Sequence, residues 1–468
     1  MLRVLRRHPR YFIGFTLAGL ALRLVFLFYF PSVTDDSRIY ADFATNWLQH
    51  GTYGETQAAQ IVPADTRLPA YPAFLAFIFA IFGVGNFRAV MLAQILLDLG
   101  TCLIIADLTR RTVSERASRV AFALAALCPF LANYAAAALT ETLEILFTGV
   151  ALDCVAAGLD LQEENRAAWS AWMGAGAATA ICILLRPDGG IVLMGIGLYL
   201  LVLLWRQWGE RRPILPVVRA GVWIAAIALA PLAPWTIRNF RTLHHFQPLA
   251  PRYATERDEA AMHGFNRWVK TWMVDYASVE EIYWMVPGDT MDPDKLPSRA
   301  FDSAEQRSAT LALIADYNRT TEMAPDLDGR FGEVAAERIR AHPIRYYLTL
   351  PGLRITDMWL RPRTELLPPD IRWWEFNDET SSSIMAVGFG VLNLGYVGLA
   401  LLGAIRQSPG VRYAGLLLGF VVVRSLFLGS LENPEPRYTL ECYPVVVLYS
   451  GALISDLWSQ HRPDFKNS

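Results

Sequence analysis

Two adjacent acids, Asp35 and Asp36, stand where the chain leaves its first long apolar run, residues 11–30. A run of that length can cross about 30 Å of hydrocarbon. Tyr40 and apolar residues at helical spacing follow the acids, which predicts a helix lying flat on the membrane surface and ending at Gly51. Two solvated loop acids are the simplest interpretation. A carboxylate at this level could also be a general base, or a metal ligand, for a substrate whose tail lies in the bilayer.

Further acids and arginines are expected at the same outer membrane level. They are Arg67 in RLPAYP, Glu141 in LTETLE with Glu144 one turn deeper, Arg186 in LLRPDGG, Arg238 in PWTIRN, and Arg437 beside Tyr438 in ENPEPRY. Taken singly, each has a structural explanation, because arginines often cap helix ends and prolines form turns. Together they place opposite charges on a face that positive charge normally avoids. They predict a shared, mixed-charge outer cavity, with His244 as a further candidate for its wall.

Charged residues also fall inside the apolar runs, where they are costly and are either functional or paired. They are Arg23, Asp98, Glu144, Asp153 and Arg424. Pairing between helices is the alternative to a functional polar interior, and we favour it for Asp153 near the inner end of its run.

Composition sets the class of protein. The 468 residues are 53% hydrophobic and 18% charged, against about 25% charged in soluble domains, and the mean hydropathy is +0.27. The net charge of −2 does not indicate nucleic-acid binding. The five cysteines lack metal-ligand spacing, so we expect free thiols.

The fold class predicted is an all-α polytopic membrane protein with about ten spans, each near 20 residues. We expect them at 11–30, 88–109, 117–135, 139–159, 167–185, 189–205, 216–236, 384–405, 411–430 and 440–458. The apolar piece 68–83 is short and is expected at the interface or as a re-entrant segment; an eleven-span alternative makes it a crossing.

Arginine and lysine concentrate in alternate short loops, which predicts that both termini are cytoplasmic. The expected organisation has three parts. These are an N-terminal transmembrane catalytic module (1–237) with its first external loop at 31–68, an α-rich or mixed external segment (238–383), and a C-terminal transmembrane module (384–468).

Seven motifs in this order resemble the membrane-embedded glycosyltransferases of the GT-C class, in particular the bacterial family 39-type and lipid A aminoarabinose transferase-like enzymes. The motifs are DDSRIYADFATNWLQHGTYG, RLPAYPAFLAFIFAIFG, LLDLGTCLIIADLTRR, LTETLEILF, LLRPDGG, PWTIRN and ENPEPRYTLECYP. The resemblance covers roughly 1–240 and 384–458. The first motif is the most specific, and the external segment matches only in its position and its late helical stretch.

The resemblance implies an inverting transferase that moves a sugar from a polyprenyl-phosphate donor to an acceptor hydroxyl at the outer face of the bacterial inner membrane. The family's essential acid falls on Asp36 or on Asp35, with Asp36 favoured, and its second acid falls on Glu141. Where aminoarabinose-type relatives carry a Lys near the short interfacial helix, this chain has Arg67, so the resemblance does not fix the donor sugar.

Cations are expected to stabilise the departing lipid phosphate. The candidates are Arg67, Arg186, Arg238 and Arg437, with Tyr40, Tyr71, Tyr438 and His244 as cavity residues. A divalent cation, Mg²⁺ or Mn²⁺, could assist, although no metal-binding motif is evident. The acceptor could be a lipid, a protein or a cell-envelope glycan such as lipopolysaccharide.

Two alternatives remain open. One is an O-antigen ligase-like enzyme or another glycan polymerase that uses a diphosphate-linked donor. The other is a lipid or solute transporter, which is less favoured because inverted repeats and helices broken at mid-membrane are not evident.

Overall fold

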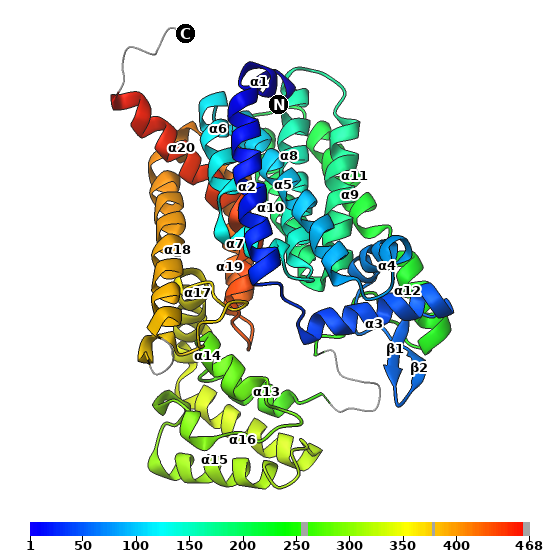
Figure 1. Ribbon diagram of the computed structural model, residues 1–468, viewed down its shortest axis with the longest axis vertical. Coiled ribbons are helices and arrows are strands. Elements are labelled where there is room, and N and C mark those ends of the chain that lie inside the picture. The colour runs from blue at the N-terminus through cyan, green and yellow to red at the C-terminus, as the bar shows by residue number, and fades with distance from the viewer. Residues whose placement is uncertain (254–260, 377–379, 462–468) are drawn as a thin grey trace. The chain divides into compact units, whose positions relative to one another are not determined.

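The computed structural model describes residues 1–253, 261–376 and 380–461, which form two units (Figure 1). Unit 1 comprises Met1–Ala254, Tyr396–Val423 and Leu440–Ser468, and unit 2 comprises Thr255–Gly395 and Arg424–Thr439. The expected C-terminal module, 384–468, therefore contributes to both units.

Within the described part of the chain, seven helical segments are long and apolar enough to cross a membrane. Four are single helices: α2 (Pro9–Tyr29), α5 (Phe87–Thr112), α8 (Glu141–Glu163) and α18 (Thr380–Gln407). Three are composite: η1 (Pro187–Gly189) with α10 (Gly190–Gly209), α11 (Leu215–Leu229) with α12 (Leu232–Leu243), and η8 (Pro436–Cys442) with α20 (Tyr443–His461). The protein is thus a helical, multi-span membrane protein.

One further pair of apolar helices is sharply bent and forms either a broken span or a re-entrant segment. Helices α6 (Glu115–Ala126) and α7 (Pro129–Ala135) meet at 52° and pass the span test only as a pair. Pro129 begins α7 and has no N–H to donate into the preceding turn, so the break falls there.

The predicted count of about ten spans is not confirmed, although every predicted span coincides with one apolar helix or, at 117–135 and 216–236, with two consecutive helices. Two of those helices are short: α9 (Trp169–Leu185) has 17 residues and α19 (Ala414–Gly429) has 16. At 1.5 Å per residue they measure about 24–26 Å, less than the hydrocarbon thickness. The interfacial candidate is α4 (Ala70–Phe82), another short apolar helix.

Charges inside the spans of unit 1 are paired. Arg23 and Asp98 are both almost fully buried, and the guanidinium donates to the Asp98 carboxylate at 2.5 Å and to the Ala126 carbonyl at 2.7 Å. Arg111 likewise donates to Asp153 at 2.9 Å. The pairing hypothesis thus holds for these residues.

The first external loop carries short elements at the end of the unit 1 bundle. Helix α3 (Asp35–His50) lies across that end, and the hairpin of β1 (Gly54–Gln57) and β2 (Gln60–Pro63) projects from it (Figure 1). The strands are antiparallel, with Gly54 opposite Pro63. Helix α3 ends at Gly51, whose φ of 67° is the left-handed conformation that glycine adopts readily, as predicted.

Unit 2 is helical and has its own core. Helices α13 (His263–Lys270), α15 (Ala304–Tyr317) and α16 (Pro325–Ala341) enclose Trp268, Trp272 and other buried apolar side chains. Helix α17 (Leu350–Leu360) follows, before α18.

The remaining elements are short. They are α1 (Leu2–Arg7), α14 (Tyr276–Ser278), η2 (Val279–Tyr283), η3 (Pro293–Lys295), η4 (Ser298–Ala300), η5 (Arg345–Thr349), η6 (Trp373–Glu375) and η7 (Ser408–Gly410).

Candidate active site

The first turn of α3 points the side chains of the adjacent residues Asp35 and Asp36 in different directions. Thr34 caps the helix with Ser37 in a reciprocal capping box, which fixes the first turn, and carboxylates there are favoured by the helix dipole. The Asp35 side chain is 95% exposed and pairs with Arg38 one turn later at 2.7 Å. Asp36 is 35% exposed and accepts a hydrogen bond from Arg67 at 3.1 Å. Asp36 therefore points toward the other predicted residues and Asp35 toward solvent.

Arg67 connects Asp36 to two predicted tyrosines. Its guanidinium lies 5.6 Å from the centre of the Tyr40 ring, a cation–π arrangement. Tyr40 meets the Tyr71 ring edge-on at 5.0 Å, and the Tyr71 hydroxyl donates to Gln94 at 2.8 Å. Four residues named from sequence thus form one cluster.

Burial raises the pKa of Tyr40 well above its usual range, so its hydroxyl stays neutral. The charges that act on it next are those of Arg67, Asp36, Arg186 and Glu144, in that order. Tyr40 is therefore close to the Asp36 cluster and also to a second one.

The second cluster gathers around Arg186, which caps the C-terminal end of α9, where a cation is favoured by the helix dipole. Arg186 lies 3.5 Å from Glu141, 3.5 Å from Glu144 and 3.1 Å from Asp188. Both glutamates occupy the first turn of α8 and are almost fully buried. The predicted cations Arg67 and Arg186 thus each contact a carboxylate proposed for catalysis.

Sequence reasoning missed two acids here. Asp188 follows Arg186 by two residues in LLRPDGG and could have been named from that motif. Glu441 is buried in η8, close enough to Glu144 for the two carboxyl groups to interact. Nothing local marks Glu441, because almost 300 residues separate it from its neighbour in the site.

The structure gives Arg238 a different set of contacts from those predicted. Its guanidinium donates to the carbonyls of Tyr53 and Ala64, on either side of the β1–β2 hairpin. It also donates to the Asn239 side chain at 2.9 Å and faces the rings of Tyr53 and Trp235. Arg238 therefore holds the first external loop together.

The two histidines after α12 behave differently. His244 is exposed and takes the left-handed conformation at the end of α12. His245, which was not selected as a site residue, contacts the buried carboxylate of Asp65 through Nε2 at 2.8 Å. The role of His244 in a cavity wall stays a prediction.

Arg437 and Tyr438 belong to unit 2. Arg437 pairs with the buried Glu435 at 2.6 Å, and its guanidinium lies 5.3 Å from the centre of the Tyr438 ring. These residues form a third group of opposite charges.

Metal-ligand side chains are not gathered into a metal-binding group in the described part of the chain. Among residues 1–253, 261–376 and 380–461, no three His, Cys, Asp or Glu side chains are arranged to hold a metal ion. The acids near Tyr40 are instead arranged around arginines. The described side chains do not fit a preformed metal cage.

The fold is that of the GT-C class. Archaeal oligosaccharyltransferase AglB from Archaeoglobus fulgidus, in complex with an inhibitory peptide and a dolichol-phosphate, matches with a TM-score of 0.50 at 11% identity. The match covers 98% of this chain and 52% of AglB, so the chain spans about half the length of that relative. The Archaeoglobus fulgidus oligosaccharyltransferase complex with Zn and sulfate matches at a TM-score of 0.51 and 11% identity, over 96% of this chain and 49% of that one.

Residues 64–237 match the sequence profile of the dolichyl-phosphate-mannose-protein mannosyltransferase family. ArnT from Cupriavidus metallidurans in the apo state is 17% identical, with a TM-score of 0.38, over 95% of this chain and 77% of ArnT. No curated protein sequence matches the chain. The fold confirms the predicted fold class, and the match of residues 64–237 to the family profile agrees with it.

Proposed function

We propose that this protein transfers a sugar from a polyprenyl-phosphate donor to an acceptor hydroxyl at the outer face of the bacterial inner membrane, with both chain termini in the cytoplasm. The observation that carries the proposal is the convergence of Asp36–Arg67 and Glu141–Arg186 beside the buried Tyr40. A family whose name specifies a dolichyl-phosphate-linked sugar matches residues 64–237, which include Arg67, Glu141 and Arg186 but not Asp36 or Tyr40.

Asp36 is the proposed base. It is partly exposed, so an acceptor can reach it, and the Arg67 guanidinium holds its carboxylate in place. The acceptor oxygen attacks the anomeric carbon and forms the new glycosidic bond. Its proton passes to Asp36, and the bond from the anomeric carbon to the phosphate oxygen breaks with its electron pair on the phosphate. One displacement inverts the anomeric centre.

Arg67 and Arg186 are the proposed phosphate ligands. Both guanidiniums are partly exposed while the acids beside Arg186 are buried, so each can offer N–H donors to a substrate without losing its carboxylate contact. Arg238 is excluded from this role here because backbone carbonyls already engage it.

The adjacent acids supply a matched test. Purified protein in detergent is supplied with a polyprenyl-phosphate sugar pool, and sugar transfer is measured for wild type, Asp36→Asn and Asp35→Asn. We expect Asp36→Asn to lower transfer by about 10²–10⁴-fold, the usual contribution of a general base. Asp35→Asn should stay within about twofold, because a surface ion pair contributes little.

Chromatographic monodispersity serves as the folding control for both variants. If wild type transfers sugar and Asp36→Asn retains its rate, Asp36 is not the base, and Glu141 becomes the next candidate. If only a diphosphate-linked donor supports transfer, the polymerase alternative replaces the proposal.

A further inference from the structure

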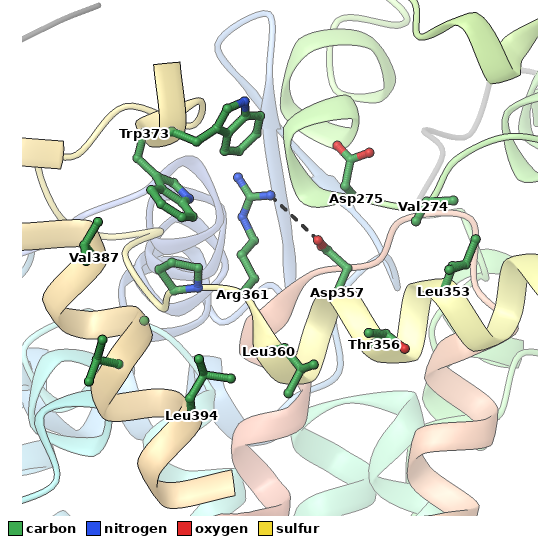
Figure 2. Close-up of a pocket in the computed structure, with 14 residues that line it drawn as sticks. Val274, Asp275, Leu353, Thr356, Asp357, Leu360, Arg361, Trp373, Val387 and Leu394 are labelled. Atoms are coloured by element: carbon green, nitrogen blue, oxygen red, sulfur yellow. Dashed lines mark ion pairs between the residues drawn. The ribbon is translucent and has the colours of Figure 1, made fainter. Parts of the chain in front are cut away.

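A groove of about 750 Å³ lies within unit 2, between α17 and α18. Figure 2 shows Leu353 and Leu360 of α17 beside Val387 and Leu394 of α18, and Val391 adds to the same wall. The volume falls within the range of pockets that bury small organic ligands, roughly 300–1,000 Å³. Most of the lining side chains are apolar and fit hydrocarbon, and the polar ones are Asp275, Thr356, Asp357 and Arg361.

The groove wall belongs to a membrane-spanning surface. Helix α18 is a candidate span with only 11% of its apolar window buried, and the Val391 and Leu394 side chains are 64% and 50% exposed. Trp373 and Trp374 line the other end of the groove, and tryptophan is enriched where hydrocarbon meets the headgroups. A hydrocarbon chain can thus lie in the groove with its head near the tryptophans.

Arg361 lies at the end of the groove and also lines a second, smaller cavity of about 130 Å³ (Figure 2). Its side chain is 7% exposed. One of its N–H groups donates to the Ile371 carbonyl at 2.6 Å, and Asp357 lies 3.9 Å away. Its charge also faces the rings of Tyr276 and Trp374. Further donors of the guanidinium stay available for a phosphate at this point.

The smaller cavity is acidic. Glu365 and Glu280 line it, and burial raises the pKa of both. Glu280 accepts a hydrogen bond from Tyr276 at 3.2 Å, whereas both buried carboxyl oxygens of Glu365 lack a hydrogen-bond partner among the described residues. Buried polar atoms without a partner are rare. The cavity has room for about four waters at ~30 Å³ each, the size of a small polar head.

We propose that unit 2 binds a phospholipid with a primary-amine headgroup. One acyl chain lies along Val391 between α17 and α18, the phosphate meets Arg361, and the ammonium meets Glu365 and Glu280. This headgroup is proposed because the cation Arg361 is followed by the acids Glu365 and Glu280 in the smaller cavity, just as the phosphate of such a lipid is followed by its amine. The binding does not depend on the transferase activity proposed above.

The test uses the full chain in phosphatidylcholine nanodiscs, whose quaternary amine has no N–H to donate. Trace phosphatidylethanolamine or phosphatidylglycerol with a photoreactive acyl chain is added, and cross-linked peptides are mapped. We expect phosphatidylethanolamine to label residues 353–361 and 387–394 at least severalfold more than phosphatidylglycerol. Equal labelling by the two lipids, or labelling that maps elsewhere, would overturn the proposal.

Two variants on α18 test the groove. Val391→Trp should block it and reduce labelling about tenfold, whereas Leu392→Trp should label like wild type, because Leu392 is 47% exposed on the same helix but does not line the groove. If Val391→Trp labels as strongly as wild type, the acyl chain does not lie there.

Glu365→Gln tests the headgroup. It should lower labelling by phosphatidylethanolamine about tenfold, the effect of one charge-assisted hydrogen bond, and leave phosphatidylglycerol unchanged. An equal loss for both lipids would mean that Glu365 only supports the fold, and the amine assignment would fail.

Discussion

Replacing Arg186 with glutamine should destabilise unit 1 and reduce sugar transfer for two separable reasons. The guanidinium lies within 3.5 Å of Glu141, Glu144 and Asp188, and the glutamate side chains are only 1% and 4% exposed. Removing one member of a buried group of opposite charges lowers the free energy of unfolding by about 3–5 kcal/mol, because the remaining charges are left uncompensated.

This cost converts to a shift in melting temperature. At ~2.1 cal/mol/K per residue, the unfolding entropy of a chain of 468 residues is about 1 kcal/mol/K, so we expect a drop of about 3–5 °C. Thermal unfolding followed by tryptophan fluorescence in detergent measures it. Arg166→Gln is the matched control: Arg166 and its partner Glu164 are 67% and 59% exposed, and the change should be under about 1 °C.

The double variant Arg186→Gln/Glu144→Gln separates stability from function. Removing one uncompensated acid should restore part of the loss, with a coupling of about 0.5–3 kcal/mol. Transfer should stay reduced by about 10²–10³-fold in both variants, because the phosphate ligand is missing. Additive melting shifts would refute the charge group, and recovery of transfer in the double variant would refute the role of Arg186 toward phosphate.

Two further predictions concern unit 2. A Cβ at Gly264 would lie 1.8 Å from the Asp328 carbonyl oxygen, so Gly264→Ala should cost about 3 kcal/mol or more and increase hydrogen exchange in α13 and α16. Gly329→Ala is the control, because no heavy atom lies within 4 Å of its added Cβ, and it should leave hydrogen exchange in α13 and α16 unchanged. Equal exchange in the two variants would contradict the close packing of Gly264 against Asp328. Burial raises the pKa of Asp357 from 3.8 to about 6 despite the nearby Arg361. The protonated form therefore favours the folded state, and this contribution is present below pH 3.8 and lost as pH rises through about 6. Asp357→Asn should flatten the pH dependence of exchange in α17 between those values, and an unchanged slope would show that another group titrates.

Local patterns were enough to predict the fold class and several residues that the structure brings together. Each apolar run became one helix or two consecutive helices, and Asp36, Arg67 and Arg186 stand at a predicted helix start, beside the short apolar helix and at a predicted span end. The span count is not confirmed because hydropathy locates a helix more reliably than it gives the helix length.

The directions of the side chains could not be predicted from the sequence. Asp35 and Asp36 are adjacent, and only the geometry of the first turn of α3 directs one to Arg38 and the other to Arg67. Glu441 reaches Glu144 through the packing of unit 1, which no spacing records.

Arg238 shows that arginines predicted at the same membrane level can have different roles. It holds the carbonyls of Tyr53 and Ala64, and the Tyr53 hydroxyl donates to the Arg67 carbonyl at 2.9 Å. Arg67 in turn holds Asp36 at 3.1 Å. A chain of contacts therefore runs from α12 through the external hairpin to the proposed base. Arg238 donates to two backbone carbonyls of the first external loop, whereas Arg67 and Arg186 each contact a carboxylate of the proposed site. Arg67 also donates to the Thr66 carbonyl at 3.2 Å, so the contact with a carboxylate is what distinguishes the two arginines proposed to face the substrate.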